Sequence, residues 1–442
     1  MRPTATSAAR SSTSPSLRIL HECPQCGGPV DLEETDRLLT CGYCRVRLQI
    51  AGPGPRRLLL PPKDPFDPDL FYIPYWRIKG QVLTCTSSGL VHSIVDRTFR
   101  AIEDDALPLT LGFRPQAMRL RFATPETQGR FLAPSVTLET AVAATLRSLR
   151  SPLEESRIFE TLLGETMSVV HLPVILRDGI LDAVVGAPLT SADRLLAARR
   201  GPLAAAGRRV SAGGGRPLDA ANQIDRENLG VQFLPTLCPE CGWSLIGERD
   251  SLVLVCPTCR TAWEADDRRW SKVALASLPG VSESARLLPF WRIRASIEGL
   301  SLRTRVDLVR LGNLPETPGV GREDGPLHFW SPAFKLHPEH YLRIAATMTL
   351  ARPEPSAEAN LESLPIHPVT LARNEAIDAV RVIVARMARP ARPVMSRLAG
   401  ARIDVEEATL VCVPFESHGS DLIQHAIPLC VNRNLLEHGR HI

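Results

Sequence analysis

The segment CPQCGGPVDLEETDRLLTCGYC, from Cys23 to Cys44, returns in outline as CPECGWSLIGERDSLVLVCPTC, from Cys238 to Cys259. Each segment holds two C-x2-C pairs with fourteen residues between them, and every cysteine is displaced by 215 positions. Two such pairs can place four sulfurs about 2.3 Å from one zinc ion in a closed tetrahedron. The sequence therefore predicts two structural zinc ions, with the ligands Cys23, Cys26, Cys41, Cys44, Cys238, Cys241, Cys256 and Cys259.

An energetic argument supports a metal in each segment. A unit of about thirty residues buries too little apolar surface to fold alone, because domains below roughly 40 residues usually need a metal or disulfides. Structural zinc contributes on the order of 10 to 16 kcal/mol of apparent binding free energy. A redox dithiol, the alternative, needs a single C-x2-C pair at the start of a helix. Gly27 and Gly242 follow the first pair and suit the left-handed backbone of the turn.

The 215-residue displacement continues beyond the cysteines, which indicates a duplication. It carries Pro74, Trp76, Arg77 and Ile78 onto Pro289, Trp291, Arg292 and Ile293. Further along, Val136-Thr137-Leu138 parallels Val369-Thr370-Leu371, and Pro188-Leu189 parallels Pro428-Leu429, with larger displacements that imply insertions in the second half. Each half is predicted to be a ribbon followed by a longer domain.

The longer domains show strand and helix patterns. Residues 71–96 are rich in β-branched and aromatic residues around a break at 87–89, which predicts a hairpin, with 287–311 as its counterpart. Apolar residues at helical spacing predict helices from about Val136 and over 377–387. Two further hairpins are expected over 169–188 and 410–429. The fold class expected is α+β: a tandem duplication, each half a four-cysteine zinc ribbon followed by a small antiparallel-sheet domain with a packed helix.

These patterns predict six segments. They are a disordered tail over 1–20, zinc ribbon 1 over 21–50, α+β domain 1 over 66–190, a linker over 191–231, zinc ribbon 2 over 234–270 and α+β domain 2 over 286–435.

Composition excludes several classes of protein. The chain has 442 residues, of which 44% are hydrophobic and 23% charged, as in an ordinary globular protein. The formal net charge is only +4, so the overall charge is too small to drive binding to nucleic acid or to a membrane. No uninterrupted apolar stretch of about 18 residues and no secretory signal are present, so we expect a cytoplasmic protein without a membrane partner. A transit peptide is the alternative interpretation of the Ser- and Arg-containing N-terminus.

The motif Cys-Pro-x-Cys-Gly followed by Cys-x-x-Cys resembles the zinc ribbons of transcription factor IIB, of RNA polymerase subunits and of the primosomal helicase. The resemblance covers about thirty residues in each half. Together with the aromatic segments around Trp76 and Trp291, the chain also resembles bacterial tandem zinc-ribbon proteins. These resemblances imply zinc and a ribbon fold, and they imply no reaction.

Local charge bears on the partner. Five acidic residues outnumber three arginines in 21–50, and four acidic residues outnumber two arginines in 236–265. The ribbons are therefore predicted to bind phosphate groups poorly. An acid-free run with Arg194, Arg199, Arg200, Arg208, Arg209 and Arg216 could contact phosphates, although a solvated linker is the simpler interpretation. We therefore expect a non-enzymatic scaffold or adaptor with a protein partner. The alternative is a nucleic-acid-binding accessory protein in replication or transcription.

The remaining residues of interest have ordinary interpretations. No phosphate-binding loop, dinucleotide fingerprint or H-E-x-x-H motif is present, so no enzyme is expected. Trp76 and Trp291 are predicted to anchor their strands rather than to form a partner-binding patch. Cys85 is predicted to be a small buried hydrophobe. His418 and His425, with Cys412 and Cys430, could suggest another metal site, but packing roles are favoured because no knuckle spacing exists.

Overall fold

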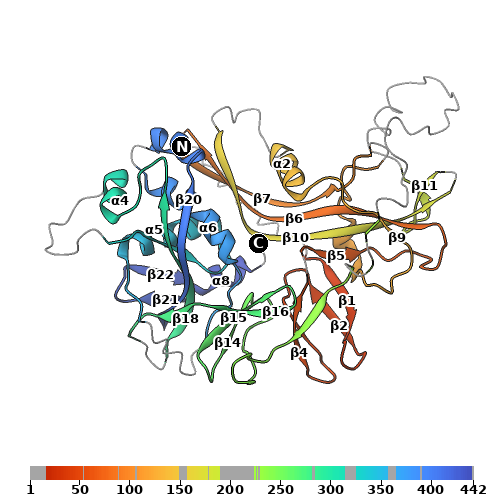
Figure 1. Ribbon diagram of the computed structural model, residues 1–442, viewed down its shortest axis with the longest axis horizontal. Coiled ribbons are helices and arrows are strands. Elements are labelled where there is room, and N and C mark those ends of the chain that lie inside the picture. The colour runs from red at the N-terminus through yellow and green to blue at the C-terminus, as the bar shows by residue number, and fades with distance from the viewer. Residues whose placement is uncertain are drawn as a thin grey trace, which may run out of the picture.

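The computed structural model describes residues 16–52, 54–87, 89–104, 107–148, 157–177, 179–189, 223–224, 226, 229–280, 284–313, 325–356, 365–388 and 391–440. It is a mixed α+β structure made mostly of strands (Figure 1). The strands of the first part of the chain are β1 (Arg18–Glu22), β2 (Pro29–Glu33), β3 (Leu38–Thr40), β4 (Arg47–Ala51), β5 (Arg56–Leu59), β6 (Leu70–Thr86), β7 (Gly89–Arg100), β8 (Arg119–Phe122), β9 (Arg130–Phe131), β10 (Arg157–Leu176), β11 (Ile180–Asp182) and β12 (Ala187–Pro188).

The second part of the chain continues the numbering. Its strands are β13 (Gln232–Pro235), β14 (Val253–Cys256), β15 (Thr261–Asp266), β16 (Arg269–Val273), β17 (Leu275–Ser277), β18 (Arg286–Ile297), β19 (His328–Pro332), β20 (Ile403–His418), β21 (Asp421–Gln424) and β22 (Leu429–Asn432). The helices within the described residues are α1 (Arg114–Ala117), α2 (Leu138–Ser148), α4 (Arg305–Gly312), α5 (Pro338–Ala351), α6 (Arg373–Met387), α7 (Ala391–Ala399) and α8 (Arg433–Gly439).

The long strand β6 organises the first half. It pairs antiparallel with β7 through the predicted turn and with β10 on its other side. Its alternating residues belong to different cores. Ile73 and Tyr75 pack toward residues 17–50, the segment around the first cysteine quartet that we call the first ribbon, whereas Trp76 and Ile78 pack under α2. All seventeen residues of β6 are buried, because both of its faces are covered. The hairpin predicted over 71–96 and the helix predicted from Val136 are confirmed.

The sheets are mixed, which corrects the prediction of purely antiparallel sheets. The path β12-β11-β10-β5-β8-β1-β2 contains parallel pairs of β10 with β5 and of β1 with β8, and β6 pairs in parallel with β9. In the second sheet β17 pairs in parallel with β20. Alternation of apolar residues predicts that a strand exists, but it does not determine the direction of a neighbour that is far away in sequence.

The second half is built on β18 and β20, which pair antiparallel in the order β19-β18-β20-β21-β22. The helix predicted over 377–387 is α6, and the hairpin predicted over 410–429 is formed by β20 and β21. The hairpin predicted over 287–311 is wrong, because β18 ends at Ile297 and α4 follows. Thr304 caps α4 by accepting a hydrogen bond from the Asp307 N–H, and the Asp307 side chain closes a capping box.

The two halves share a core. Leu83, Cys85 and Leu163, from the far ends of β6 and β10, belong to a hydrophobic cluster whose other buried members come from residues 253–436. Hydrogen bonds cross the same contact: the Gln81 amide donates to the Leu336 carbonyl at 2.9 Å, and the Glu375 carboxylate accepts from the Gly164 N–H at 2.6 Å. The halves are therefore packed together at the level of side chains and backbone.

Two predicted boundaries need comment. The tail predicted over 1–20 ends earlier, because β1 begins at Arg18, and Leu17 and Ile19 are fully buried. Residues 191–222 of the predicted linker, including its arginine-rich run, lie outside the described residues. Within the part of the chain that is described, no helix has both the length and the apolar character needed to cross a membrane.

Candidate metal centres

The first quartet gathers Cys23, Cys26, Cys41 and Cys44 at the tips of two turns. Its four sulfurs lie within 4.8 Å of one another, with Cys23 Sγ 3.7 Å from Cys44 Sγ and Cys26 Sγ 3.6 Å from Cys41 Sγ. Sulfurs bound at about 2.3 Å to one tetrahedral zinc ion would be about 3.8 Å apart. Gly27 adopts the predicted left-handed conformation at φ +74°, which lets its N–H bond back to the Cys23 carbonyl at 2.8 Å.

The second quartet gathers Cys238, Cys241, Cys256 and Cys259, also within 4.8 Å, and Cys241 Sγ lies 3.5 Å from Cys256 Sγ. Gly242 has φ +74° and bonds back to the Cys238 carbonyl at 2.8 Å. The two predicted ligand sets are thus each brought together, and each group could hold a metal ion.

The electrostatics of the sulfurs fit a divalent cation. Backbone N–H groups, of Cys44 first and then of Tyr43, lower the pKa of Cys41 to about 6. Burial opposes ionisation of Cys238, but the N–H groups of Cys241 and Glu240 outweigh it and lower the pKa to about 7. Contact with Cys241 raises the pKa of Cys259 to about 12. Four neighbouring thiols cannot all ionise unaided, so a tetrathiolate needs a cation to balance it.

The two quartets differ in their surroundings. In the first, Cys23 and Cys41 belong to a large core cluster with Leu17, Ile19 and Tyr75, and β1 is hydrogen-bonded to β8 of the main sheet. In the second, β14, β15 and β16 form a separate three-stranded sheet. Its cluster contains Cys238, Leu245, Leu254, Cys256 and Trp263, together with Leu38 from the first ribbon.

An aromatic side chain lies near each centre, from opposite turns. In the first ribbon Tyr43 packs over Gly28, where a Cβ atom would come within 2.6 Å of the Tyr43 ring, and Tyr43 is 68% exposed. In the second ribbon the position equivalent to Gly28 is Trp243, which is 61% exposed, and the position equivalent to Tyr43 is Thr258. Exposed large side chains are thus present on both ribbons, which the sequence pattern did not indicate.

The two ribbons also contact each other. The N–H groups of Arg37 and Leu38 donate to the Arg249 carbonyl at 2.6 and 2.8 Å, and Arg249 forms an ion pair with Asp36. Strand β4 of the first ribbon pairs antiparallel with β13, which leads into the second (Figure 1). The centres are therefore held in one assembly.

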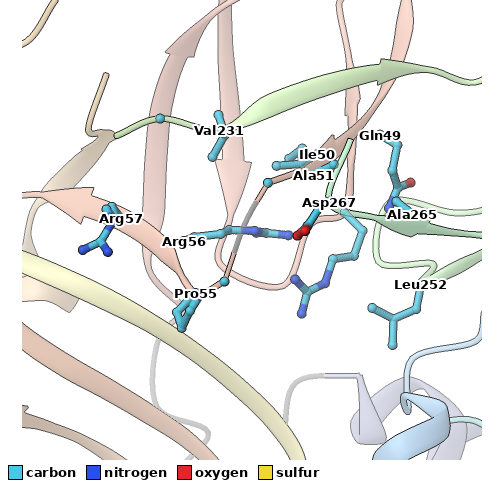
Figure 2. Close-up of a pocket in the computed structure, with 14 residues that line it drawn as sticks. Gln49, Ile50, Ala51, Pro55, Arg56, Arg57, Val231, Leu252, Ala265 and Asp267 are labelled. Carbon is cyan, nitrogen blue, oxygen red and sulfur yellow. The ribbon is translucent and has the colours of Figure 1, made fainter. Parts of the chain in front are cut away.

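A partly enclosed cavity of about 170 Å³ lies at this contact. Figure 2 shows Arg56 extending across the cavity toward Asp267, whereas the neighbouring side chain of Arg57 points away from it. The full set of lining residues is Arg37, Gln49, Ile50, Ala51, Gly52, Gly54, Pro55, Arg56, Arg57, Gly230, Val231, Leu252, Ala265 and Asp267.

The predicted tryptophan anchors are confirmed. Trp76 is 8% exposed and its indole N–H donates to the Val136 carbonyl at 2.8 Å, just before α2. Trp291 is fully buried and donates to the Leu371 carbonyl at 3.0 Å, just before α6. Each tryptophan ties a central strand to the start of a helix.

The remaining cysteines and histidines are divided between core and surface. Cys85 and Cys412 are fully buried, and burial raises the pKa of Cys85 to about 11 and of Cys412 to about 12. Cys430 is exposed. His418 and His425 do come together with Glu416, within 4.8 Å, at the end of β20 and β21. Because all three side chains are well exposed and such groups are common without a metal, we assign no ion to them.

Comparisons with protein-family models, with curated proteins and with solved structures found no match to this chain.

Proposed function

We propose that this protein is a non-enzymatic zinc-binding adaptor that presents its second ribbon to a protein partner. The observation that carries the proposal is a surface formed by Leu237, Trp243 and Ile246, which are 51%, 61% and 55% exposed. We call these three residues the ribbon-2 patch. The three residues belong to one short hairpin, and exposed large apolar side chains that gather on a surface are typical of interaction sites.

Two members of the ribbon-2 patch, Leu237 and Ile246, lie on one face of a short hairpin, and Trp243 lies in the connection between its strands. Leu237 is bridged to Ser244, so Leu237 and Ile246, two residues after Ser244, share the outer face. Leu245 between them points inward and is fully buried. A metal ion bound by Cys238 and Cys241 would fix the turn of this hairpin, so the patch would be presented on a rigid support.

Zinc is the metal that we propose for both centres. Four cysteine ligands form a soft, closed set that suits zinc, and the sulfur separations of 3.5 to 3.7 Å are close to those of a tetrahedral site. With four protein ligands no position is left for water, so the role would be structural rather than catalytic. A reducing cytoplasm would keep the thiols available for the metal.

We also propose that the halves arose by tandem duplication as zinc ribbons with appended domains. Several hydrogen bonds occur in equivalent places: Ala101 N–H to the Pro74 carbonyl matches Ala333 N–H to Pro289, both at 3.0 Å. The tryptophan bonds to Val136 and Leu371 match in the same way. This correspondence aligns Val136 with Leu371, two residues beyond the alignment that the sequence suggests.

A nucleic-acid partner is the alternative function. Acidic residues around the second ribbon are largely engaged with cations of the chain: Glu240 pairs with Lys272, and Glu248 and Asp250 pair with Arg440. The ribbon-2 patch itself contains no arginine or lysine. Phosphate binding depends on such cations, so a protein partner is favoured.

The test is affinity purification with two matched variants. We expect the combined substitution Leu237→Ser, Trp243→Ser and Ile246→Ser to lose the partner while zinc content and thermal unfolding stay unchanged. Phe113→Ser, at a side chain that is 81% exposed elsewhere, should keep the partner. Equal recovery of the same partners by all three proteins, or salt-sensitive binding of DNA or RNA that the patch variant also shows, would refute the adaptor proposal.

A further inference from the structure

The cavity between the two ribbons is lined by more arginine side chains than carboxylates. Arg37 belongs to the first ribbon. Arg56 of β5 and Asp267, in the turn between β15 and β16 of the second ribbon, are labelled in Figure 2. Glycine backbone at Gly52 and Gly230 forms part of the wall. The lining thus contains three arginines and one carboxylate, although Arg57 turns away.

Arg37 and Arg56, which line the cavity, have few partners in the protein. Within the described residues, neither Arg37 nor Arg56 forms an ion pair, and the Arg37 side chain makes no hydrogen bond. Arg56 donates from Nη1 to the Glu34 carbonyl at 3.0 Å. Its Nη2 is shielded from solvent and donates to no protein atom. An unsatisfied charged donor in such a place is costly, so a missing acceptor is implied.

The nearest carboxylates are engaged elsewhere. Glu34 pairs with the fully buried Arg77 at 3.2 Å, Asp36 pairs with Arg249, and Asp250 pairs with Arg440 at 2.5 Å. Glu375, whose charge acts on Arg37 more strongly than that of any other carboxylate, accepts a hydrogen bond from the Gly164 N–H at 2.6 Å. Burial, and next the charge of Arg37, lower the pKa of Arg56 well below its usual range. The carboxylates near Arg56, Asp36 and Glu34, do not offset these two effects.

We propose that this cavity binds a phosphate-class oxyanion between the guanidinium groups of Arg37 and Arg56. Guanidinium groups present paired N–H donors that match the oxygens of phosphate. A volume of about 170 Å³ exceeds that of a single water site, roughly 10 to 15 Å³, and is smaller than a drug-sized pocket of about 300 Å³ or more.

Binding at this place would connect the two metal centres. The wall comes from the first ribbon at Gln49 and Ile50 and from the second at Leu252 and Ala265. An anion held there would neutralise cations of the first half and contact the second half at the same time. Its occupancy would therefore stabilise the relative orientation of the ribbons, independently of any partner on the ribbon-2 patch.

The experiment measures thermal unfolding of the zinc-loaded protein in inorganic phosphate, with sodium chloride adjusted to constant ionic strength. We expect Tm of the wild type to rise with phosphate, as linkage requires. Arg37→Gln and Arg56→Gln should lose this rise, with phosphate affinity by titration calorimetry reduced about tenfold or more. Without phosphate, Arg37→Gln should unfold at the same temperature as the wild type or higher, because an unpaired charge is removed.

Two further variants make the result specific. Arg269→Gln, at an exposed arginine of β16, is the matched control and should keep the phosphate response. Asp267→Asn removes the carboxylate of the lining and should tighten phosphate binding; asparagine tolerates the φ of +49° at this position. A phosphate response that survives both Arg37→Gln and Arg56→Gln, or no heat and no Tm rise for the wild type, would overturn the proposal.

Phenyl phosphate distinguishes the source of the anion. Binding of phenyl phosphate and inorganic phosphate alike would assign the cavity to a terminal phosphate group of a larger molecule. Binding of inorganic phosphate alone would assign it to the free anion. Binding of neither would overturn the site and would leave the adaptor proposal, which depends on the ribbon-2 patch, unaffected.

Discussion

The two ribbons carry the same ligand spacing but are embedded differently. The first contributes β1 and β2 to the large sheet and shares its core with the first half. The second has its own three-stranded sheet, with a small cluster around Trp263, and it joins the large core of the second half only through side chains, those of Val253, Ala262 and Val273. An identical metal motif therefore does not imply identical dependence on the metal, because neighbouring strands can supply part of the stability. The second ribbon, whose sheet is not continuous with the sheet of its half, also carries the exposed patch.

Removing one cysteine ligand from each centre should give the largest difference in stability between the two ribbons. We expect Cys256→Ser to unfold residues 236–273 locally, since structural zinc is worth on the order of 10 kcal/mol in small units. Cys41→Ser should expose only the turns of the first ribbon, because β1 remains paired with β8. Hydrogen exchange by mass spectrometry, with metal content measured in parallel, tests this. Equal loss of protection in β1 and β14 would contradict the comparison, and Cys430→Ser, at an exposed cysteine, is the control.

Within the second ribbon, two tryptophans should differ in their contribution to stability. Trp263 is 6% exposed and its indole N–H donates to Thr261 Oγ1 at 2.9 Å, so Trp263→Ala should cost about 3 to 5 kcal/mol of unfolding free energy. Trp243→Ala should change it by less than about 0.5 kcal/mol, because the side chain is mostly exposed. Denaturant unfolding of both variants measures the difference. A large loss with Trp243→Ala would place that side chain in the core.

Both halves should lose stability in acid through one buried histidine each. Burial lowers the pKa of His171 and of His367 to about 3, and each ring lies 5.1 Å from a phenylalanine ring. The unfolded chain binds the proton more readily, so stability is present above about pH 6.5 and is lost as pH falls toward 3. At pH 5, each histidine should have lowered the free energy of unfolding by about 2 kcal/mol relative to neutral pH.

Because thiols also take up protons in acid, the comparison must be made between variants. Denaturation at pH 7 and pH 5 should show a smaller pH-dependent loss for His171→Leu than for the wild type, whatever the packing cost at pH 7. An unchanged difference between the two pH values would show that His171 does not titrate in the unfolding transition.

Removing the ion pair between the ribbons should change the free energy of unfolding least. Arg249 is 57% exposed at its side chain and pairs with the buried Asp36. We expect Arg249→Gln to cost about 1 kcal/mol or less of unfolding free energy, because solvent screens the exposed guanidinium of Arg249. The Asp36 carboxylate also keeps its hydrogen bond from the Glu33 N–H, and the backbone bonds to the Arg249 carbonyl remain. Thermal unfolding at low and high salt measures it. A loss of several kcal/mol would mean that this pair, rather than the strand pairing of β4 with β13, holds the ribbons together.

The parts of the structure that could be predicted are those set by short segments. The turns at Gly27 and Gly242, the hairpin between β6 and β7, and helices α2 and α6 all follow from residues close together in sequence. The spacing of the cysteines in the sequence was enough to predict that the four members of each quartet lie together. Where the pattern was extended to the second half by analogy, at 287–311, it failed, because the capping box at Thr304 begins a helix there.

The sequence by itself determined the two cysteine quartets, since four thiols at knuckle spacing can meet only in a narrow range of backbone geometries. Only the tertiary structure decided that β1 lies beside β8, that Cys85 enters the core of the other half, and that Arg37 meets Arg56 at a cavity. These contacts join residues tens to hundreds of positions apart. Their energies depend on how whole faces pack, and a local pattern of side chains carries no information about which distant face will be met.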